Sequence, residues 1–305
     1  MMKSNSLVNY DVLTHVKMRD LEIKVVKPEI WNFEVVKGKD AWREVVYSAR
    51  MSGVPPQVKD RSVFRMIVEN DYSSALEHII IKFDLKMSKG NSPEFLEHRM
   101  ISHTGYSTRY IEVSRGIDKN KEAYEVILPF HLIKEKRDKI RRLLYDSVRN
   151  SIRSYKEIID NGIAREIARY VLPFAQAVGV YHVTLNLRSL INLLSLRLCV
   201  RSSPEFRCIA SQLYFNLMSE LPEMKGLIGC RGFMRGVCPE SNVTGVRTGK
   251  QHPLYPVCPF RFPDTEIFIP TLKELQKGMK VREFNREKAL KVQEANFRGW
   301  MDWEL

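Results

Sequence analysis

The sequence predicts an α+β fold in which a mixed sheet is flanked by helices. Residues 78–86 alternate apolar and polar side chains over their second half, as a strand with one buried face does. Residues 40–51 and 131–160 instead repeat apolar side chains at helical spacing. With 305 residues and 44% hydrophobic content, the chain can bury one large core or two modest ones.

The first half of the chain carries further helix and loop signals. A second helix is expected over residues 61–69, after Pro55 and Pro56 have ended the first. Ser92 and Pro93 are suited to begin a helix that reaches about residue 100. The segment that follows breaks periodicity, so a loop is predicted over residues 102–107 and an extended segment over 110–113.

The second half is expected to be mainly helical. The long basic helix is followed by a short helix at 163–170, a strand at 178–185, a very apolar helix at 187–198 and a polar helix at 273–299. Asn186 stands directly before the apolar helix and is well placed to cap it. From about residue 226 the chain becomes rich in Gly, Pro, Cys and Arg. We therefore divide it into a main domain at 1–225, which includes an N-terminal extension, and a Cys-containing appendage with a terminal helix at 226–305.

The formal charge of +13 and the pI near 9.5 indicate an anionic partner. Nucleic acid is one candidate, and a pocket that collects phosphorylated or carboxylated ligands is the other. The sequence carries no RNA-binding signature, zinc-finger spacing or helix-turn-helix, so nucleic acid is the weaker of the two. The longest apolar stretches are too short to cross a bilayer and no signal segment is recognisable, which leads us to expect a cytoplasmic protein.

Five cysteines, an odd number, argue against a disulfide scaffold. Cys230, Cys238 and Cys258 lie in the Gly/Pro-rich segment, and Cys208 lies on the preceding helix. These four could bind zinc, or an iron–sulfur cluster because all four ligands are thiolates. The alternative is that they are unlinked buried thiols. Cys199, within the apolar helix, is expected to be a small core residue.

Two groups of polar residues have the chemistry to hold a phosphate. The first group is His98, Arg99, Ser107 and Arg109, which surround the predicted loop at 102–107. Guanidinium groups and a hydroxyl donor are the groups that bind phosphate oxygens, especially where backbone amides are also free. Taken alone, this group is a weak signal, because a His and two Arg in a loop are more often surface residues.

The second group surrounds the apolar helix. Arg169 precedes it, while Asn186, Arg188, Asn192 and Arg197 interrupt a run of Leu and Ile. Placing charged and amide groups on so apolar a helix costs desolvation unless each finds a partner. The alternatives are a bound ligand, or a helix cap, an edge amide and two ion-paired arginines.

Together the two groups resemble the signatures of the flavin-dependent thymidylate synthase family. That family has Arg-His-Arg, seven residues and then Ser, where this chain has Glu97-His98-Arg99 and then Ser107. The segments Ala168–Pro173 and Asn186–Arg197 resemble the family's Ala-Arg-x-x-Leu-Pro and Asn-x-Arg-Ser-Leu-x-Asn-Phe-Leu-x-Leu-Arg. The resemblance extends over about residues 34–221.

The resemblance implies a homotetramer, with active sites at subunit interfaces, that reductively methylates dUMP to dTMP. It implies FAD as cofactor, NADPH as reductant and methylene-tetrahydrofolate or an analogue as carbon donor. It assigns the uracil edge to Arg197 as the catalytic residue, and the nucleotide with its phosphate to Ser107, Arg109 and Arg169. The residues that it assigns to FAD are Ser74, His98, Arg99, Asn186, Arg188 and Asn192.

Several positions depart from the family's pattern. Glu97 replaces the first Arg of the motif, and Thr104-Gly105 stands where the family has Asn-Glu. Tyr72 replaces a flavin-positioning His, and Glu94 stands where a Gln meets the nucleotide. Three interpretations remain open: a divergent synthase, a paralogue that uses FAD on a different nucleotide-like substrate, and a non-catalytic relative that binds nucleic acid.

Overall fold

A four-stranded antiparallel sheet forms the centre of the structure, a computed structural model that describes residues 15–18, 21–113, 123–133, 135–177, 179–240, 246–247, 250–251, 256–280 and 283–303. The strand order is β3-β4-β7-β5, where β3 is Glu29–Val35, β4 is Ile80–Met87, β5 is Ile101–Gly105 and β7 is Gly179–Asn186. A smaller sheet joins β1 (His15–Met18), β2 (Leu21–Val25) and β6 (Tyr124–Val126), and here β2 and β6 are parallel. The predicted α+β class with helix-flanked sheets is confirmed; the mixed pairing occurs in the smaller sheet.

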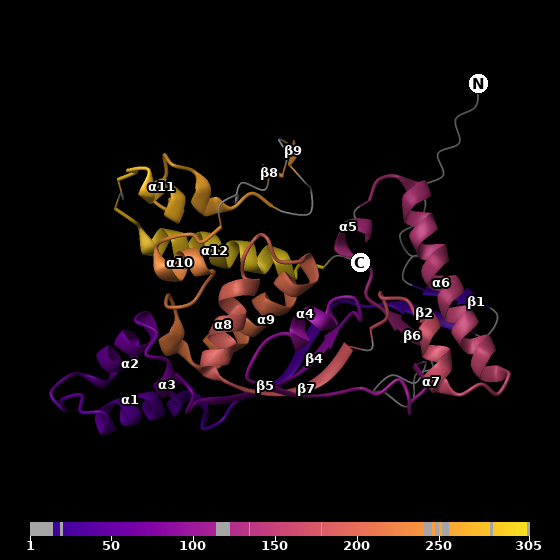
Figure 1. Cartoon of the computed structure of the whole chain (residues 1–305), viewed down its shortest axis with the longest axis horizontal. Coiled ribbons are helices and arrows are strands. Elements are labelled where there is room, and N and C mark those ends of the chain that lie inside the picture. Colours follow the sequence, from indigo (N-terminus) through magenta and orange to yellow (C-terminus); the bar gives the residue numbers. More distant parts are fainter. Residues whose placement is uncertain are drawn as a thin grey trace.

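Helices surround both sheets (Figure 1). Between β3 and β4 the chain forms α1 (Trp42–Met51), α2 (Asp60–Glu69) and α3 (Ser73–Leu76), and α4 (Ser92–Leu96) lies between β4 and β5. The later helices are α5 (Phe130–Ile133), α6 (Asp138–Asp160), α7 (Arg165–Ala168), α8 (Leu187–Arg197), α9 (Pro204–Glu220), α10 (Arg231–Arg235), α11 (Leu272–Gln276) and α12 (Arg286–Met301). A short hairpin joins β8 (Val246–Arg247) to β9 (Lys250–Gln251). In the described part of the chain, no helix combines the length and apolarity that a bilayer span requires.

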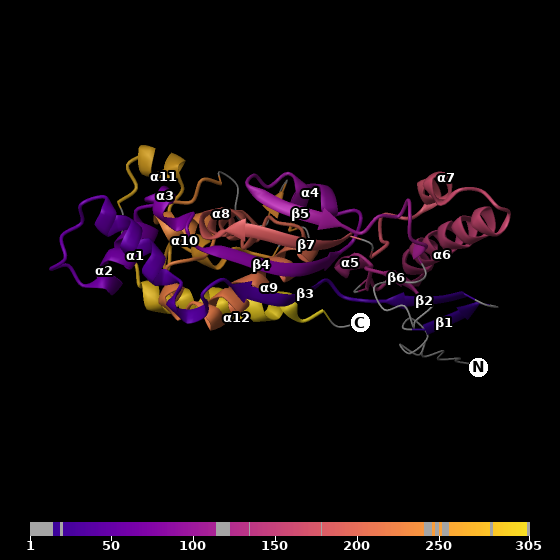
Figure 2. The same ribbon diagram turned by 90° about the horizontal axis from the view of Figure 1, so that it is seen from below.

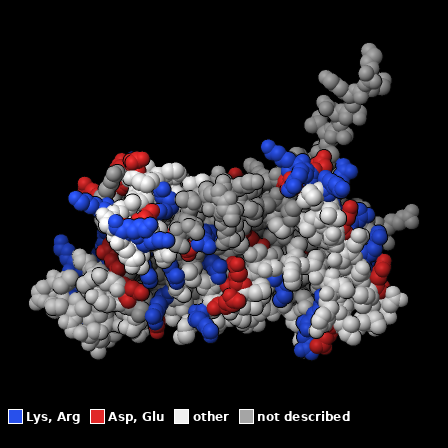
Figure 3. Space-filling view, turned by 45° about the horizontal axis from the view of Figure 1, so that its top comes forward, with Lys and Arg blue, Asp and Glu red and all other residues white. Residues whose placement is uncertain are grey.

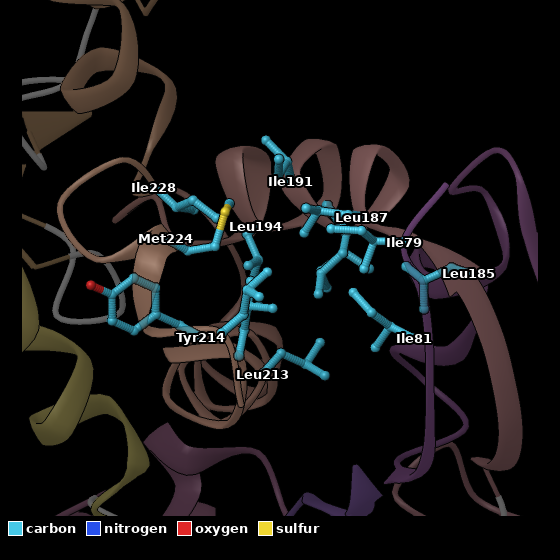
Figure 4. Close-up of a cluster of buried hydrophobic side chains, with 14 of the residues drawn as sticks. Ile79, Ile81, Leu185, Leu187, Ile191, Leu194, Leu213, Tyr214, Met224 and Ile228 are labelled. Atoms are coloured by element: carbon cyan, nitrogen blue, oxygen red, sulfur yellow. The ribbon is translucent and has the colours of Figure 1, made fainter. Parts of the chain in front are cut away.

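The main core lies between the central sheet and α8 and α9. Strand β4 alternates, so that Ile81, Phe83 and Leu85 are fully buried on one face. Figure 4 shows Leu187 of α8 beside Ile79 and Ile81, and Leu194 of α8 beside Leu213 and Tyr214 of α9. Helix α9 packs on β3 and α8, and α12 packs on α9. Burial of each such side chain contributes on the order of 1.5–3 kcal/mol, which fixes α8 rigidly against the sheet.

A second core lies at the other end of the molecule. It joins the smaller sheet to α6, with Tyr124 and Val126 of β6 against Ile152 and Tyr155 of α6. Figures 1 and 2 show the resulting elongated shape, with β1, β2, β6, α6 and α7 at one end and α1, α2 and α3 at the other.

Five predicted elements differ from the structure. The helix from Ser92 ends at Leu96 instead of about residue 100. The predicted loop at 102–107 is largely β5, because residues 101–105 pair with residues 181–185 of β7. Residues 110–113 form turns instead of an extended segment, since the backbone amide of Tyr110 donates to the Ser107 carbonyl. The long helix is divided into α5 and α6, and the terminal helix into α11 and α12. In each case the type or the end of the element is set by a tertiary partner or by a local break, and hydrophobic periodicity predicts neither of these.

Candidate active site

A cavity of about 570 Å³ lies among α2, α3, α8 and α10. Its volume is within the range of small-molecule and cofactor sites. Three residues that the resemblance assigns to FAD line it: Arg99, Arg188 and Asn192. The α8 residues on its wall lie three to four positions apart, as Arg188, Asn192 and Ser195 do, so one face of α8 forms that wall.

Five arginines give this cavity its charge: Arg99, Arg188, Arg231, Arg235 and Arg286. Glu69, Asp71 and Glu77 also line it, so cations exceed carboxylates by two. Two of these carboxylates are already engaged, because Arg188 Nη1 lies 2.7 Å from Glu77 Oε1 and Arg65 Nε lies 2.9 Å from Glu69 Oε1. The cavity therefore has the charge and the forked donors to bind an anionic ligand of the size of a dinucleotide cofactor.

Arg197 lies at the end of α8 in a compact polar cluster beside this cavity. Its Nη1 donates to Oε2 of Glu94 at 2.9 Å, and its Nε donates to Nε2 of His98 at 3.0 Å. Its guanidinium also lies 4.6 Å from the centre of the Phe206 ring. The side chain is only 19% exposed, so its charge acts in a partly desolvated environment. His98 links the polar cluster around Arg197 to the cavity, because the next residue in the chain, Arg99, lines the cavity.

The protonation state of His98 follows from this arrangement. Burial, and secondly the charge of Arg197, lower the pKa of His98 from 6.5 to about 4. His98 is therefore neutral at physiological pH and accepts a hydrogen bond from Arg197 at Nε2. The structure places His98 as a partner of Arg197, and it is not among the residues on the cavity wall.

The predicted phosphate residues lie elsewhere. Arg109 forms an ion pair with Glu166 of α7 at 3.0 Å, and Arg169 directly follows α7, with its guanidinium 5.8 Å from the Tyr170 ring. Ser107 belongs to the same segment as Arg109. Helix α7 lies at the small-sheet end of the molecule, far from α2 and α10 in both ribbon views (Figures 1 and 2). One chain therefore does not bring these three residues to the cavity.

Two further predicted flavin residues have other positions. Asn186 is the N-cap of α8, where its side chain accepts from the Ser189 amide at 2.9 Å, so the predicted cap is confirmed. Ser74 is exposed on α3, and neither Ser74 nor Asn186 is among the residues on the cavity wall.

The structure explains one departure from the family's pattern, Gly105, but not Glu97 or Tyr72. Gly105 pairs with Tyr181 across β5 and β7, and a Cβ atom added at Gly105 would lie 2.6 Å from the Tyr181 ring. A side chain at position 105 is thus excluded by the aromatic ring opposite. Glu97 and Tyr72 are exposed, and nothing in the structure explains these two substitutions.

The predicted metal ligands are not brought together as a set. Cys208 packs with Ile127, Ala177 and Trp303, and Gln212 donates to its sulfur at 3.4 Å. Cys230, Cys238 and Cys258 belong to another cluster and line a cavity that Cys208 does not, so the structure does not bring the predicted fourth ligand to the other three. Within the described ranges, no three His, Cys, Asp or Glu side chains are placed to hold a metal ion.

Three arginines that line the cavity were not predicted from the sequence as site residues: Arg231, Arg235 and Arg286. They belong to α10 and α12, in the segment that we separated as an appendage. The only signal was the enrichment of Arg after residue 226, since these residues lie outside the region of resemblance. The structure shows that α10 forms one wall of the cavity.

Fold and cavity together define an α+β protein with an arginine-rich site for an anionic cofactor or nucleotide. Residues 34–223 match the family described as thymidylate synthase complementing protein, and the chain belongs to that family. The flavin-dependent thymidylate synthase of Thermosipho melanesiensis is 28% identical over 195 residues, which cover 58% of this chain and 80% of the relative. That of Kosmotoga olearia is 30% identical over 190 residues, with the same two coverages of 58% and 80%. The predicted class of enzyme, a flavin-dependent methyltransferase of the thymidylate synthase kind, is confirmed.

Solved structures agree with this assignment of the fold. The UMP/dUMP methylase PolB from Streptomyces cacaoi bound with 5-Br dUMP superposes with a TM-score of 0.54 at 23% identity, covering 66% of this chain and 94% of PolB. The same protein bound with 5-Br UMP gives a TM-score of 0.53 at 25% identity, with the same coverage of 66% and 94%.

Proposed function

We propose that this enzyme converts dUMP to dTMP with FAD, using NADPH as reductant and methylene-tetrahydrofolate or an analogue as carbon donor. The observation that carries the proposal is the cavity of about 570 Å³ on which Arg99, Arg188 and Asn192 meet. The names of its relatives and structural neighbours support the substrate class.

The residues on the cavity wall fit FAD. A diphosphate needs several charged or amide donors, and Arg231, Arg235 and Arg286 supply them beside the residues of α8. The apolar side chains Leu76, Ile191 and others on the same wall suit a ring system. When bound, the flavin supplies the hydride chemistry, and the chain's own residues orient and polarise the substrate.

Arg197 is the residue that we assign to the uracil edge. A guanidinium stays charged at every working pH and stabilises negative charge on a ring that loses its N3 proton. Neutral His98 accepts the Nε hydrogen and fixes the plane of the guanidinium, which leaves the Nη1 and Nη2 side for a ligand. Glu94 occupies that side through contacts with both its carboxylate and its carbonyl oxygen. Nucleotide binding therefore requires Glu94 to move or to share Arg197.

A second copy of the chain would complete the site. Ser107, Arg109 and Arg169 would hold the nucleotide phosphate, but within one chain Arg109 pairs with Glu166 of α7 and Arg169 directly follows α7, which lies at the opposite end from α2 and α10. A homotetramer that places the α7 end of one chain against the cavity of another would join them. We therefore propose this assembly together with the reaction.

The test is a product assay on the purified enzyme. The enzyme is supplied with FAD, NADPH, methylene-tetrahydrofolate and either dUMP or UMP, and the methylated nucleotide is identified by mass spectrometry. We expect dTMP from dUMP. Arg197→Ala should lower turnover by at least about 100-fold, since a charged donor to a developing anion is worth about 2.7–4 kcal/mol. Bound FAD in this variant, measured by absorbance, should remain unchanged.

Three outcomes would contradict the proposal. Methylation of UMP with no reaction of dUMP would favour the paralogue that acts on a different nucleotide. Full turnover in Arg197→Ala would remove the assigned role of Arg197. Binding of nucleic acid with a steep salt dependence, and without flavin, would favour the non-catalytic alternative. On the face in Figure 3, described basic and acidic side chains are interspersed, which does not favour a continuous nucleic-acid track.

A further inference from the structure

A second cavity, of about 50 Å³, is lined by four cysteines that the fold collects from separate segments. Cys199 follows α8, Cys230 precedes α10, Cys238 follows α10, and Cys258 precedes residues 259–261. We call Cys199, Cys230, Cys238 and Cys258 the cysteine quartet. All five cysteines of the chain are free, so no disulfide joins any of them.

Each sulfur of the quartet has a backbone amide donor two or three residues further along the chain. The amide of Arg201 donates to Cys199 and that of Phe233 donates to Cys230. The amides of Glu240 and Phe260 donate to Cys238 and Cys258 in the same way. Amide hydrogen bonds to sulfur stabilise thiolates and tune the clusters that they ligate. Cys208 lacks this local pattern, since its hydrogen-bond donor is the side chain of Gln212.

The quartet is not arranged as a site for a single zinc ion. Zinc binds sulfur at about 2.3 Å, which places the four sulfurs of a tetrahedral site about 3.8 Å apart. No described group of three or more ligating side chains is close enough to hold one ion. The cavity of about 50 Å³ nevertheless exceeds several times the roughly 10–15 Å³ that one water needs. The quartet thus surrounds a space for a group of several atoms.

The surroundings favour a compact anion. The walls include Phe260, Ile269 and Trp300, which keep water out, and two arginines, Arg231 and Arg261, lie among them with one carboxylate, Glu240. Arg261 is ion-paired with Glu274, so Arg231 is the cation that offsets the net negative charge of four thiolates around iron and sulfide. Ser195 and Arg231 line both this cavity and the larger one, so the two sites are adjacent.

We propose that the cysteine quartet holds an iron–sulfur cluster. Clusters of the two-iron and four-iron types are both held by four cysteine thiolates. The geometry that carries the proposal is the convergence of four amide-bonded sulfurs from separate segments on one cavity. It corrects the ligand set expected from the sequence, because Cys199 takes the place of Cys208.

The test measures iron and acid-labile sulfide in the full chain, purified without oxygen and without a polyhistidine tag. We expect equal amounts of iron and sulfide, about two or four of each per chain. Dithionite reduction should give a low-temperature electron paramagnetic resonance signal that flavin does not produce. Zinc without sulfide would overturn the proposal. So would the absence of iron and sulfide after incubation with ferrous iron and sulfide under reducing conditions.

Matched variants locate the cluster. Cys199→Ser and Cys258→Ser should each lower bound iron by at least about fivefold, whereas Cys208→Ser, at a buried thiol outside the quartet, should keep it. Bound FAD and the circular dichroism spectrum report whether each variant has folded. Equal iron loss in Cys208→Ser and Cys199→Ser, with folding intact, would contradict the assigned ligands. Because iron is measured directly, this result does not depend on whether dUMP is methylated.

Discussion

Arg197 and Glu94 form an ion pair in which Nη1 lies 2.9 Å from Oε2. Arg197 is the residue that we assign to the substrate, and Glu94 stands where the flavin-dependent thymidylate synthases have a Gln. A carboxylate at this place partly neutralises the guanidinium, and it competes with an anionic uracil for the same donor atoms. The pair therefore connects one departure from the family's pattern, Glu94, to the residue that we assign to the reaction, Arg197.

The first prediction concerns this pair. Glu94→Gln removes the competing charge while it keeps the length and polarity of the side chain. A partly exposed pair of this kind is worth up to about 1 kcal/mol, so we expect the KM for dUMP to fall about fivefold. Steady-state kinetics with varied dUMP measures it. Glu97→Gln, three residues further along on the exposed surface, serves as control and should leave KM unchanged. An increase in KM for Glu94→Gln would show that Glu94 binds the nucleotide itself.

The second prediction tests the wall that α10 contributes. Arg235 is exposed and lines the larger cavity at the end of α10. Arg235→Ala should raise the Kd of FAD about tenfold, since a hydrogen bond to a charged group contributes about 1.5–3 kcal/mol and exposure reduces it. Flavin fluorescence titration gives the Kd. Arg142→Ala removes the same charge from α6, at the other end of the molecule, and should leave the Kd unaltered. Equal effects of both variants would indicate a general charge effect.

The sequence predicted the parts of the site that local patterns determine. Asn186 caps α8 because an amide before an apolar helix can accept from the amides of its first turn. The strand β7 and the helix α8 followed from periodicity alone. Local patterns could not predict that Arg231 and Arg235 line the cavity. Their position depends on the packing of α10 against α8. The same limit applies to Cys199, whose partners come from three segments that no spacing connects.

The third prediction follows from the pairing of Gly105 with Tyr181. A Cβ at position 105 would lie 2.6 Å from the ring, which is itself buried and held by Phe95. Gly105→Ala should therefore lower the free energy of unfolding by about 1–3 kcal/mol, the usual cost of overpacking. Urea unfolding followed by circular dichroism measures the change. Gly299→Ala in α12 is the control, because nothing lies within 4 Å of the added Cβ. There we expect a gain of about 0.5–1 kcal/mol.

The restoration of the family's Glu at position 105 should fail for the same reason. Gly105→Glu places an even larger side chain against Tyr181, so we expect a loss of stability without a gain in flavin affinity. A stable variant with a lower Kd for FAD would show that the ring of Tyr181 moves aside easily.

The fourth prediction is a pH dependence that His98 introduces. Its pKa is lowered to about 4 in the folded protein and is 6.5 in the unfolded chain. Between these values the unfolded chain binds a proton that the folded chain excludes, so stability falls as pH decreases from 6.5 toward 4. The contribution lost is up to about 3 kcal/mol. Urea unfolding of the wild type and of His98→Gln, at intervals from pH 4.5 to 8, separates this effect from that of the carboxylates.

The effect of His98 is read from the difference in unfolding free energy between the wild type and His98→Gln. His98→Gln keeps an acceptor for Arg197 but cannot titrate, so the difference in unfolding free energy should be constant above pH 7. It should then shift in favour of the variant as the pH falls below 6.5. A difference that stays constant down to pH 4.5 would mean that His98 is protonated in the folded protein. In that case the hydrogen bond from Arg197 Nε to His98 Nε2 could not form as the structure shows it, since both atoms would be donors.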